Sequence, residues 1–367
     1  VHRTAEAAKA IIRAYYGASP QYSYFSGCSN GGRQAMMEAQ RFPKDFDGII
    51  AGAPAHNITG ILGAFIYNVQ RIFPDNANPK ESVITPDNRR LLQSAVLEQC
   101  DYLDGIGDGI LDDPRECGFK LSNLPKCSGN KPAPHCLTVK QQKAIAAVYD
   151  GPRNQDGRFY PGFPFGGENE MEAWQTWITG PNSTLIEQFG EPSSQYGFGT
   201  QGLKYLLVRD PKFDYTTYDF ATFESDRKLP STILDATDSN LTEFKKSGGK
   251  LLLYHGWTDA ALTALASIDY FEAVETTDPN VRDYFRLFML PGVFHCAGGV
   301  GPDRVDWLQA IENWVERDKA PTRLTAFRVV NEAVDMMRPI CVFPQRAVYI
   351  GSGSTDEIAN FECRDPD

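Results

Sequence analysis

The stretch YFSGCSNGGRQ, residues 24–34, places a short apolar run directly before a turn of small residues. Within it, residues 27–31 match the pattern G-x-S-x-G, with Ser29 at the centre. Between a strand and a helix, this pattern forms a sharp turn that exposes the serine hydroxyl, and its glycines allow strand and helix to approach closely. An apolar run precedes the pattern and a helical pattern at 33–41 follows it. This context favours a nucleophile elbow over an incidental glycine-rich turn.

Three further apolar segments predict buried strands. They are FDGIIAGAPA at 46–55, GKLLLYHGWTD at 249–259 and YFRLFMLPG at 284–292. Such short and nearly all-apolar runs are expected of central parallel strands. Helical patterns lie at 262–274 and 303–317, and this alternation predicts an α/β fold with a doubly wound sheet.

The alternation of strands and helices stops between about residues 59 and 245. This stretch is rich in Pro, Gly, Asn and aromatic residues, and it holds four of the eight cysteines. We interpret it as a lid inserted into an α/β-hydrolase core. The expected division is a discontinuous core of residues 1–60 and 245–367 and a lid of residues 61–244.

The first residues predict an amphipathic helix, followed by a single strand before Ser29. The expected apolar face of this helix comprises Ala5, Ala8, Ile11, Ile12 and Tyr15. A fold of this kind takes one of its two oxyanion donors from an earlier strand-helix loop, and no such loop precedes Ser29 here. We therefore expect that this donor and several core strands belong to a segment outside this chain, such as a separate N-terminal fragment.

Charge and composition narrow the class of partner. The chain has a formal net charge of -11 and a sequence pI of about 5.1, which argues against nucleic acid or an anionic membrane surface as the main partner. Its apolar runs are shorter than the roughly 20 residues of a membrane span. Eight cysteines and three N-glycosylation sequons, at Asn57, Asn182 and Asn240, favour a secreted protein over a cytosolic one with scattered thiols.

A nucleophilic serine needs a base and a group that orients the base. In this fold they follow the serine in the order Asp or Glu, then His. Asp259 and His295 follow successive predicted strands in that order, so we expect a Ser29–Asp259–His295 triad. His255 is expected to pack in the HGWTD turn and fix the loop of Asp259. The backbone N–H of Asn30 is the expected oxyanion donor within the chain.

Two cysteines flank the predicted nucleophile and base. Cys28 directly precedes Ser29, and Cys296 directly follows His295. If Ser29 and His295 lie within hydrogen-bond reach, these neighbours could have Cα atoms about 4.4–6.8 Å apart, as a disulfide requires. A Cys28–Cys296 bridge would hold nucleophile and base in register. The alternative, Cys28 as the nucleophile, needs an exposed thiolate near a base, and a residue one step from the tip of the elbow points away from it.

Together, GCSNGG, HGWTD and FHCAGG resemble the signature of the tannase and feruloyl esterase family, over the whole chain. The resemblance implies a secreted serine esterase with an α/β-hydrolase core, a large lid and a disulfide joining the cysteines beside Ser and His. It implies hydrolysis of aromatic carboxylic esters: feruloyl esters of plant cell-wall sugars, chlorogenate, or the galloyl esters cleaved by tannases. We favour a feruloyl esterase, because we see no cluster that must clamp a trihydroxy ring.

The segment CDYLDGIGDGILDDPREC, residues 100–117, matches the family's calcium loop. Asp101, Asp104 and Asp108 form an acidic cluster on a loop bent by glycines, and hard oxygen ligands on a flexible loop suit Ca²⁺. The resemblance implies that these carboxylates and the backbone carbonyls of Ile106 and Ile110 hold the ion. The alternative is a solvated acidic turn.

Eight cysteines allow 105 connectivities, so the remaining pairs rest mainly on the resemblance, together with proximity in the chain. They are expected to be Cys100–Cys117, Cys127–Cys136 and Cys341–Cys363.

Aromatic residues of the lid could stack on a planar acid or simply form the core of the lid. They are Phe159, Tyr160, Phe163, Phe165, Trp174 and Trp177. Trp257 and Leu262, near Asp259, are expected to line the substrate pocket. Two other protein classes remain possible at this point. A glycan-binding protein on a decayed hydrolase scaffold would not need the complete triad, and a peptidase of the prolyl-oligopeptidase kind would not need the paired cysteines.

Overall fold

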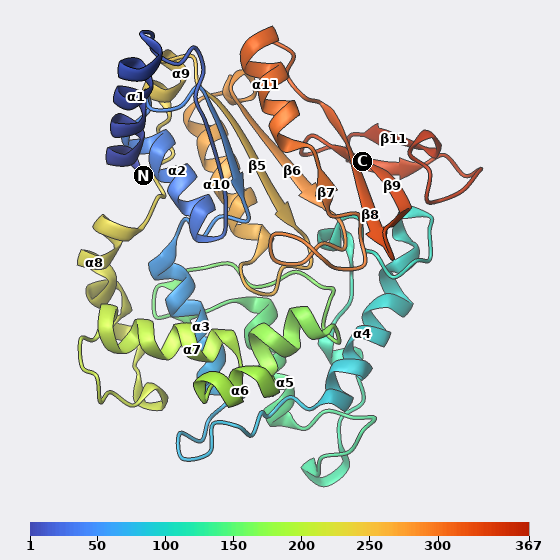
Figure 1. Ribbon diagram of the computed structural model, residues 1–367. Coiled ribbons are helices and arrows are strands. Elements are labelled where there is room, and N and C mark those ends of the chain that lie inside the picture. The colour runs from blue at the N-terminus through green and yellow to red at the C-terminus, as the bar shows by residue number, and fades with distance from the viewer. Residues whose placement is uncertain (367) are drawn as a thin grey trace.

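The computed structural model describes residues 1–366 and contains a four-stranded parallel sheet (Figure 1). Strands β1 (Tyr24–Cys28), β2 (Gly48–Gly52), β5 (Lys250–Gly256) and β6 (Phe285–Leu290) lie side by side in this order. All three pairings are parallel. The predicted α/β fold class is confirmed, and all four predicted strands are present with slightly shorter bounds.

Helices cover both faces of this sheet. Helices α2 (Asn30–Arg41) and α10 (Ala264–Thr277) pack on one face, where their side chains join Ile49 and Leu251 in one buried cluster. Helix α11 (Trp307–Arg317) covers the other face, where Ile50 and Leu252 belong to a separate cluster. Successive strand residues therefore enter opposite layers, which explains why these strands are apolar at nearly every position.

Helix α1 (His2–Tyr16) forms where it was predicted, but its apolar face is not buried. Only Ala5 of the helix is buried, whereas Ile11 is 67% and Tyr15 is 79% exposed. The helical spacing of apolar residues predicted this helix correctly. An apolar helix face usually packs against the protein core, but within residues 1–366 this one remains exposed.

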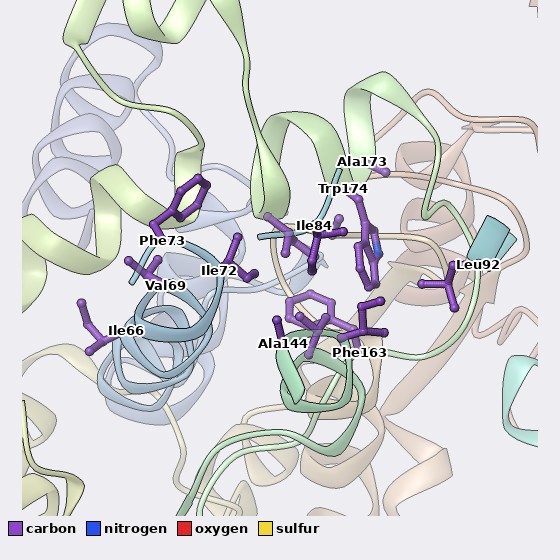
Figure 2. Close-up of a cluster of buried hydrophobic side chains, with 14 of the residues drawn as sticks. Ile66, Val69, Ile72, Phe73, Ile84, Leu92, Ala144, Phe163, Ala173 and Trp174 are labelled. Atoms are coloured by element: carbon purple, nitrogen blue, oxygen red, sulfur yellow. The ribbon is translucent and has the colours of Figure 1, made fainter. Parts of the chain in front are cut away.

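The long connection from β2 to β5 is mostly helical and has a hydrophobic cluster of its own, part of which Figure 2 shows. Trp174, Phe163, Phe73 and Ile84 are buried there. The core and lid boundaries remain a prediction, and Ala260 and Phe294 join this cluster from loops beyond β5 and β6. The helices are α3 (Ile58–Ile72), α4 (Pro86–Cys100), α5 (Val139–Asp150), α6 (Ser183–Phe189), α7 (Ser194–Gly202), α8 (Phe223–Leu234) and α9 (Thr242–Lys246), with a short pair β3 (Arg153–Asn154) and β4 (Gly157–Arg158).

The C-terminal part adds antiparallel strands that the sequence patterns did not predict. A three-stranded sheet consists of β7 (Arg304–Val305), β8 (Arg323–Val330) and β9 (Ala333–Cys341). A second pair consists of β10 (Arg346–Tyr349) and β11 (Phe361–Arg364). The Phe288–Val342 bridge connects the end of β9 to the parallel sheet.

The structure forms each of the four expected disulfides. Three close loops of 9 to 22 residues, namely Cys100–Cys117, Cys127–Cys136 and Cys341–Cys363. The fourth, Cys28–Cys296, joins residues 268 positions apart. In the described part of the chain, none of the helices has the length and apolar character to span a membrane.

Candidate active site

Three predicted site residues lie on loops at one edge of the parallel sheet. Ser29 directly follows β1, Asp259 comes three positions after β5, and His295 comes five positions after β6. Because the strands are parallel, their carboxyl ends meet at this edge, where ligands of open α/β sheets bind.

Ser29 adopts the strained backbone of an elbow, with φ of 63° and ψ of -119°. Left-handed φ is costly for a residue with a Cβ, so surrounding contacts must impose it. The Ser29 N–H donates to the Gly52 carbonyl at 3.0 Å, and its own carbonyl accepts from the N–H groups of Arg33 and Ala55 at 3.0 Å. The end of β2 and the start of α2 therefore fix the turn from both sides.

The elbow needs two glycines, but only one of them belongs to the G-x-S-x-G pattern. A Cβ on Gly27 would lie 2.6 Å from the Gly31 backbone, whereas a Cβ on Gly31 would meet nothing within 4 Å. The second tight position is Gly32, where a Cβ would lie 2.4 Å from the Gly52 carbonyl oxygen. The expected reason for the glycines therefore holds for Gly27 and is wrong for Gly31.

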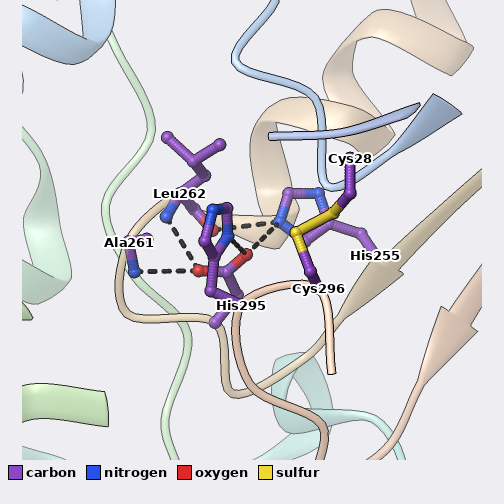
Figure 3. Close-up of a disulfide and its surroundings, with 7 residues drawn as sticks. Cys28, His255, Ala261, Leu262, His295 and Cys296 are labelled. Carbon is purple, nitrogen blue, oxygen red and sulfur yellow. Dashed lines mark hydrogen bonds and ion pairs between the residues drawn. A yellow bond between two sulfur atoms is a disulfide. The ribbon is translucent and has the colours of Figure 1, made fainter. Parts of the chain in front are cut away.

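The Cys28–Cys296 disulfide connects the elbow to the loop of His295 (Figure 3). The two Cα atoms are 6.0 Å apart, which places the residues next to them on adjoining turns. The thiol of Cys28 is consumed in this bond, so the alternative of Cys28 as nucleophile is wrong. Among the hydrogen bonds of residues 1–366, none joins the Ser29 hydroxyl to His295. Such contacts are often loose in the free enzyme and tighten with substrate.

The carboxylate of Asp259 is buried and fully partnered. Its Oδ1 accepts from the N–H groups of Ala261 and Leu262 at 2.8 and 2.9 Å. Its Oδ2 lies 2.7 Å from Nδ1 of His295 and 3.2 Å from Nε2 of His255. Burial alone would raise the pKa of Asp259, but the charge of His295 and the bonds to both histidines hold that pKa well below its ordinary value. Asp259 therefore stays ionised in a buried position.

His255 supports Asp259, as expected from the HGWTD turn. Its Nε2 lies near two acceptors, the Asp259 carboxylate and the Leu262 carbonyl at 3.0 Å, so this nitrogen carries the proton. Its Nδ1 then accepts from the Ser267 hydroxyl at 2.7 Å. The ring thus connects Ser267 of α10 to the loop that carries Asp259.

His295 has the surroundings of a general base. Its Nδ1 donates to Asp259, which leaves Nε2 free to accept a proton. Burial would lower the pKa of His295, but the charge of Asp259 and the hydrogen bond to it raise that pKa overall. The side chain is 14% exposed, and the edge of its ring meets Trp177 with ring centres 5.3 Å apart.

The other predicted site residues, Asn30, Trp257 and Leu262, have three different outcomes in the structure. Asn30 is the first residue of α2, where backbone N–H groups have no partner within the helix, so its N–H is available as a donor. The prediction that Trp257 lines the pocket is wrong, because its indole is buried beside Arg115 and Phe343 in the core. Leu262 contributes to the site through its backbone, and its buried side chain packs near Trp177.

A groove of about 650 Å³ in the connection between β2 and β5, which we call the lid groove, is a feature that the sequence patterns did not predict. Phe198 lines it and stacks on Trp177, with ring centres 6.3 Å apart. Trp177 in turn contacts His295, so two aromatic rings separate the groove wall from the candidate base. The lining residues are Ile58, Leu62, Leu185, Phe189, Glu191, Ser194, Gly197, Phe198, Gln201, Gly202, Tyr205 and Leu206.

The carboxylates of the acidic loop bind backbone N–H groups. Asp101 accepts from Gly109 at 2.8 Å, and Asp104 accepts from Ile106 at 2.9 Å. Asp108 accepts from the N–H of Ile110 at 3.0 Å. The two isoleucine side chains are buried, so their carbonyls sit on an ordered stretch of loop.

The charge around this loop is unbalanced. Burial raises the pKa of Asp104 to about 6, and Oδ2 of Asp112 is buried without a hydrogen-bond partner in the described structure. Arg338 forms an ion pair with Asp108 at 2.5 Å, and its charge does not bring the pKa values of Asp104 and Asp112 back to their ordinary range. Excess buried carboxylate on a glycine-bent loop fits a hard cation such as Ca²⁺.

The carboxylate oxygens of the acidic loop nevertheless do not lie close together in a compact cluster. In residues 1–366, the only three His, Cys, Asp or Glu side chains with ligand atoms all within 4.8 Å of one another are His2, Glu38 and Asp45.

The three sequons differ in accessibility. Asn240 is exposed in the loop before α9, whereas Asn57 and Asn182 are half-buried N-caps of α3 and α6. The Asn182 amide also donates to Thr176 at 2.9 Å, a bond that a glycan on this nitrogen would have to replace. The structure thus favours Asn240 as a glycan site, and the other two remain predictions.

Comparison with known proteins places this site in a family. The model "Tannase and feruloyl esterase" matches residues 1–364. The chain belongs to the tannase and feruloyl esterase family. It is 33% identical to the mono(2-hydroxyethyl) terephthalate hydrolase of Piscinibacter sakaiensis, over 98% of this chain and 66% of that protein. It is 26% identical to feruloyl esterase B of Aspergillus niger, over 99% of this chain and 70% of that protein.

Solved structures of the family share the fold. Feruloyl esterase B from Aspergillus oryzae superposes with a TM-score of 0.86 at 26% identity, over 99% of this chain and 73% of that one. The tannin acyl hydrolase from Aspergillus niger gives a TM-score of 0.75 at 23% identity, over 100% of this chain and 69% of that one, a likeness in fold alone. The chain thus spans about two thirds of the length of the relatives it matches.

Proposed function

We propose that this chain carries the catalytic centre of a secreted serine carboxylesterase that hydrolyses hydroxycinnamoyl, feruloyl-type esters of plant cell-wall material. The observation that carries the proposal is the buried Asp259–His295 pair on the loop that Cys296 ties to the Ser29 elbow. Four disulfides and an exposed sequon support secretion.

Each residue has a defined role in the reaction. Nε2 of His295 takes the hydroxyl proton as Ser29 Oγ attacks the ester carbonyl carbon, and Asp259 holds the imidazole and stabilises its cation. The same proton passes to the departing alcohol as the carbon–oxygen bond breaks and leaves an acyl-enzyme. Water, deprotonated by His295, then releases the acid and restores Ser29.

The negative charge of each tetrahedral intermediate requires donors beside Ser29. The Asn30 N–H at the start of α2 supplies one of them, and the partial positive charge of the helix N-terminus acts in the same direction.

The lid groove is the proposed site for the aromatic acyl group. Its walls are mostly apolar and aromatic, and its volume lies within the range of small-molecule sites, about 300–1,000 Å³. The Trp177–Phe198 stack links the groove wall to His295, which supports an acyl ring in the groove with its carboxyl end directed toward His295.

We further propose that the acidic loop holds a structural Ca²⁺ through Asp101, Asp104, Asp108 and the carbonyls of Ile106 and Ile110. When bound, the ion would offset the negative charge that burial concentrates in this loop, and it takes no part in the ester chemistry.

The test is hydrolysis of methyl ferulate, chlorogenate and methyl gallate by the protein and by Ser29→Ala, with melting measured for both. We expect turnover of the hydroxycinnamates and its loss in the variant, apart from a residual rate, because the nucleophile is gone. Turnover of methyl gallate without methyl ferulate would instead make the protein a tannase. Activity that survives in folded Ser29→Ala would contradict the serine mechanism.

A further inference from the structure

We propose that Glu191 makes the lid groove selective for aromatic acyl groups that end in a neutral hydrogen-bond donor, and that it rejects those ending in a carboxylate. The inference rests on the proposed function, since it assigns a charge preference to the far end of the acyl site.

Two chains of contacts link the groove wall to the two halves of the candidate catalytic centre. On the nucleophile side, the Ala55 N–H donates to the Ser29 carbonyl, and Ile58, three positions later, lines the groove. On the base side, Phe198 lines the groove and reaches His295 through Trp177. We infer that a planar substituent on the reacting carbonyl extends past Trp177 toward this groove.

Glu191 is the only residue with a charged side chain in the described lining of this groove. Its carboxylate packs against Gly197 of α7, where a Cβ would lie 2.0 Å from Oε2. Among residues 1–366, this carboxylate accepts no hydrogen bond and forms no ion pair. The side chain is half-buried, and burial raises its pKa above the ordinary value. The described protein thus supplies no donor to this carboxylate, and a substrate group in the groove can contact it.

These surroundings rank acyl groups by their distal substituent. A phenol can donate to Glu191 in a charge-assisted hydrogen bond, which is stronger than a neutral one. A methoxy group cannot donate a hydrogen bond to Glu191, but it also carries no charge that Glu191 would repel. A distal carboxylate would face Glu191 as a like charge in an apolar groove, which is strongly unfavourable. Terephthalate monoesters carry such a carboxylate, so we expect them to be poor substrates despite the 33% identical relative named for one.

The sharpest test uses three methyl cinnamates that differ only at the para position: hydroxy, methoxy and carboxy. The alcohol is constant, so kcat/KM differences report on the acyl site. In the native protein we expect kcat/KM for the 4-hydroxy ester to be at least about 100-fold higher than kcat/KM for the 4-carboxy ester. Glu191→Gln should narrow this ratio by about tenfold or more, mainly by raising the rate on the 4-carboxy ester.

Glu187→Gln is the matched control. Glu187 lies four positions earlier in α6, is exposed and does not line the groove, yet the substitution changes the net charge equally. We expect it to leave the ratio unchanged. If Glu191→Gln melts early, Glu191→Asp keeps the charge and should keep the selectivity.

An unchanged ratio in folded Glu191→Gln, with activity still dependent on Ser29, would overturn this inference and leave the proposed function standing. Equal narrowing by both glutamine variants would also overturn it, because the effect would then be one of net charge. If Glu191→Gln changed kcat/KM only according to the alcohol, as measured between methyl and quinate esters of one acid, the groove would hold the alcohol. That result would also overturn the inference. Absence of Ser29-dependent turnover on every ester would instead refute the proposed function.

Discussion

Two aspartates with buried carboxylate oxygens have opposite surroundings in this molecule. Asp259, at the edge of the sheet, receives two backbone N–H groups and two histidines. Asp112, beside the acidic loop, keeps some exposed surface but has a buried Oδ2 without a partner in the described structure. Burial and the charges of Asp104 and Asp113 raise the pKa of Asp112 to about 8, whereas that of Asp259 is lowered.

The difference separates two ways of placing carboxylates inside a protein. The sheet edge with the proposed catalytic site supplies its own donors, so the negative charge of Asp259 is stabilised by the fold. The acidic loop gathers more negative charge than nearby arginines neutralise, so its stability should depend on a cation from outside the chain.

The largest expected effect is on the catalytic edge. Asp259→Asn should lower kcat on methyl ferulate by about 10,000-fold with little change in fold, because an amide can favour the wrong tautomer of His295. Asp112→Asn makes the same chemical change beside the acidic loop, and we expect kcat within about twofold of native since the sites are separate. Steady-state kinetics and circular dichroism check both variants. Similar losses of kcat in the two would end the distinction between the regions.

Removal of the proposed Ca²⁺ should lower the stability of the acidic loop region. A ligand present at about 100 times its Kd stabilises the folded state by about 2.7 kcal/mol, so a chelator should lower Tm by several degrees. Asp104→Asn should lose most of this response, whereas Asp259→Asn should keep it. Thermal melts with and without chelator measure the effect. If chelator leaves the native Tm unchanged, the loop does not depend on an ion.

The two regions also differ in how far the sequence predicts them. Ser29, Asp259 and His295 follow strands whose apolar runs are unambiguous, so their common edge follows from parallel topology. Trp257 was misplaced because neighbouring loop residues point in opposite directions, and proximity to Asp259 in the chain does not settle which way an indole turns.

In the lid, local patterns carry less information. Glu191 and Phe198 come together on a groove formed by several helices, and this arrangement depends on tertiary packing. The antiparallel strands after α11 were missed for a related reason, because β9 has an exposed half and a buried half and does not alternate.

A smaller effect is expected from the two glycines that follow the elbow serine. Gly32→Ala should lower the free energy of unfolding by about 1–3 kcal/mol, because the new methyl group meets the rigid Gly52 carbonyl. Gly31→Ala should be neutral or stabilising by up to about 1 kcal/mol, since its Cβ has open space within a helix. Urea titrations compare the pair. If both are tolerated equally, the catalytic edge is less tightly built than the backbone contacts of Ser29 indicate.

The smallest effect, and the finest probe of the catalytic pair, is the pH dependence. Asp259 raises the pKa of His295 above the ordinary 6.5, and protonated His295 cannot accept the Ser29 proton. The rate kcat/KM should therefore fall as pH is lowered through a value above 6.5. The stability contribution of this group runs the opposite way: it is complete below the pKa of the unfolded chain and is lost as pH rises through the raised folded value. Activity should thus increase over the same interval in which Tm loses the contribution of the His295–Asp259 ion pair. An acid limb at or below pH 6.5 would mean that burial of His295 outweighs the charge of Asp259.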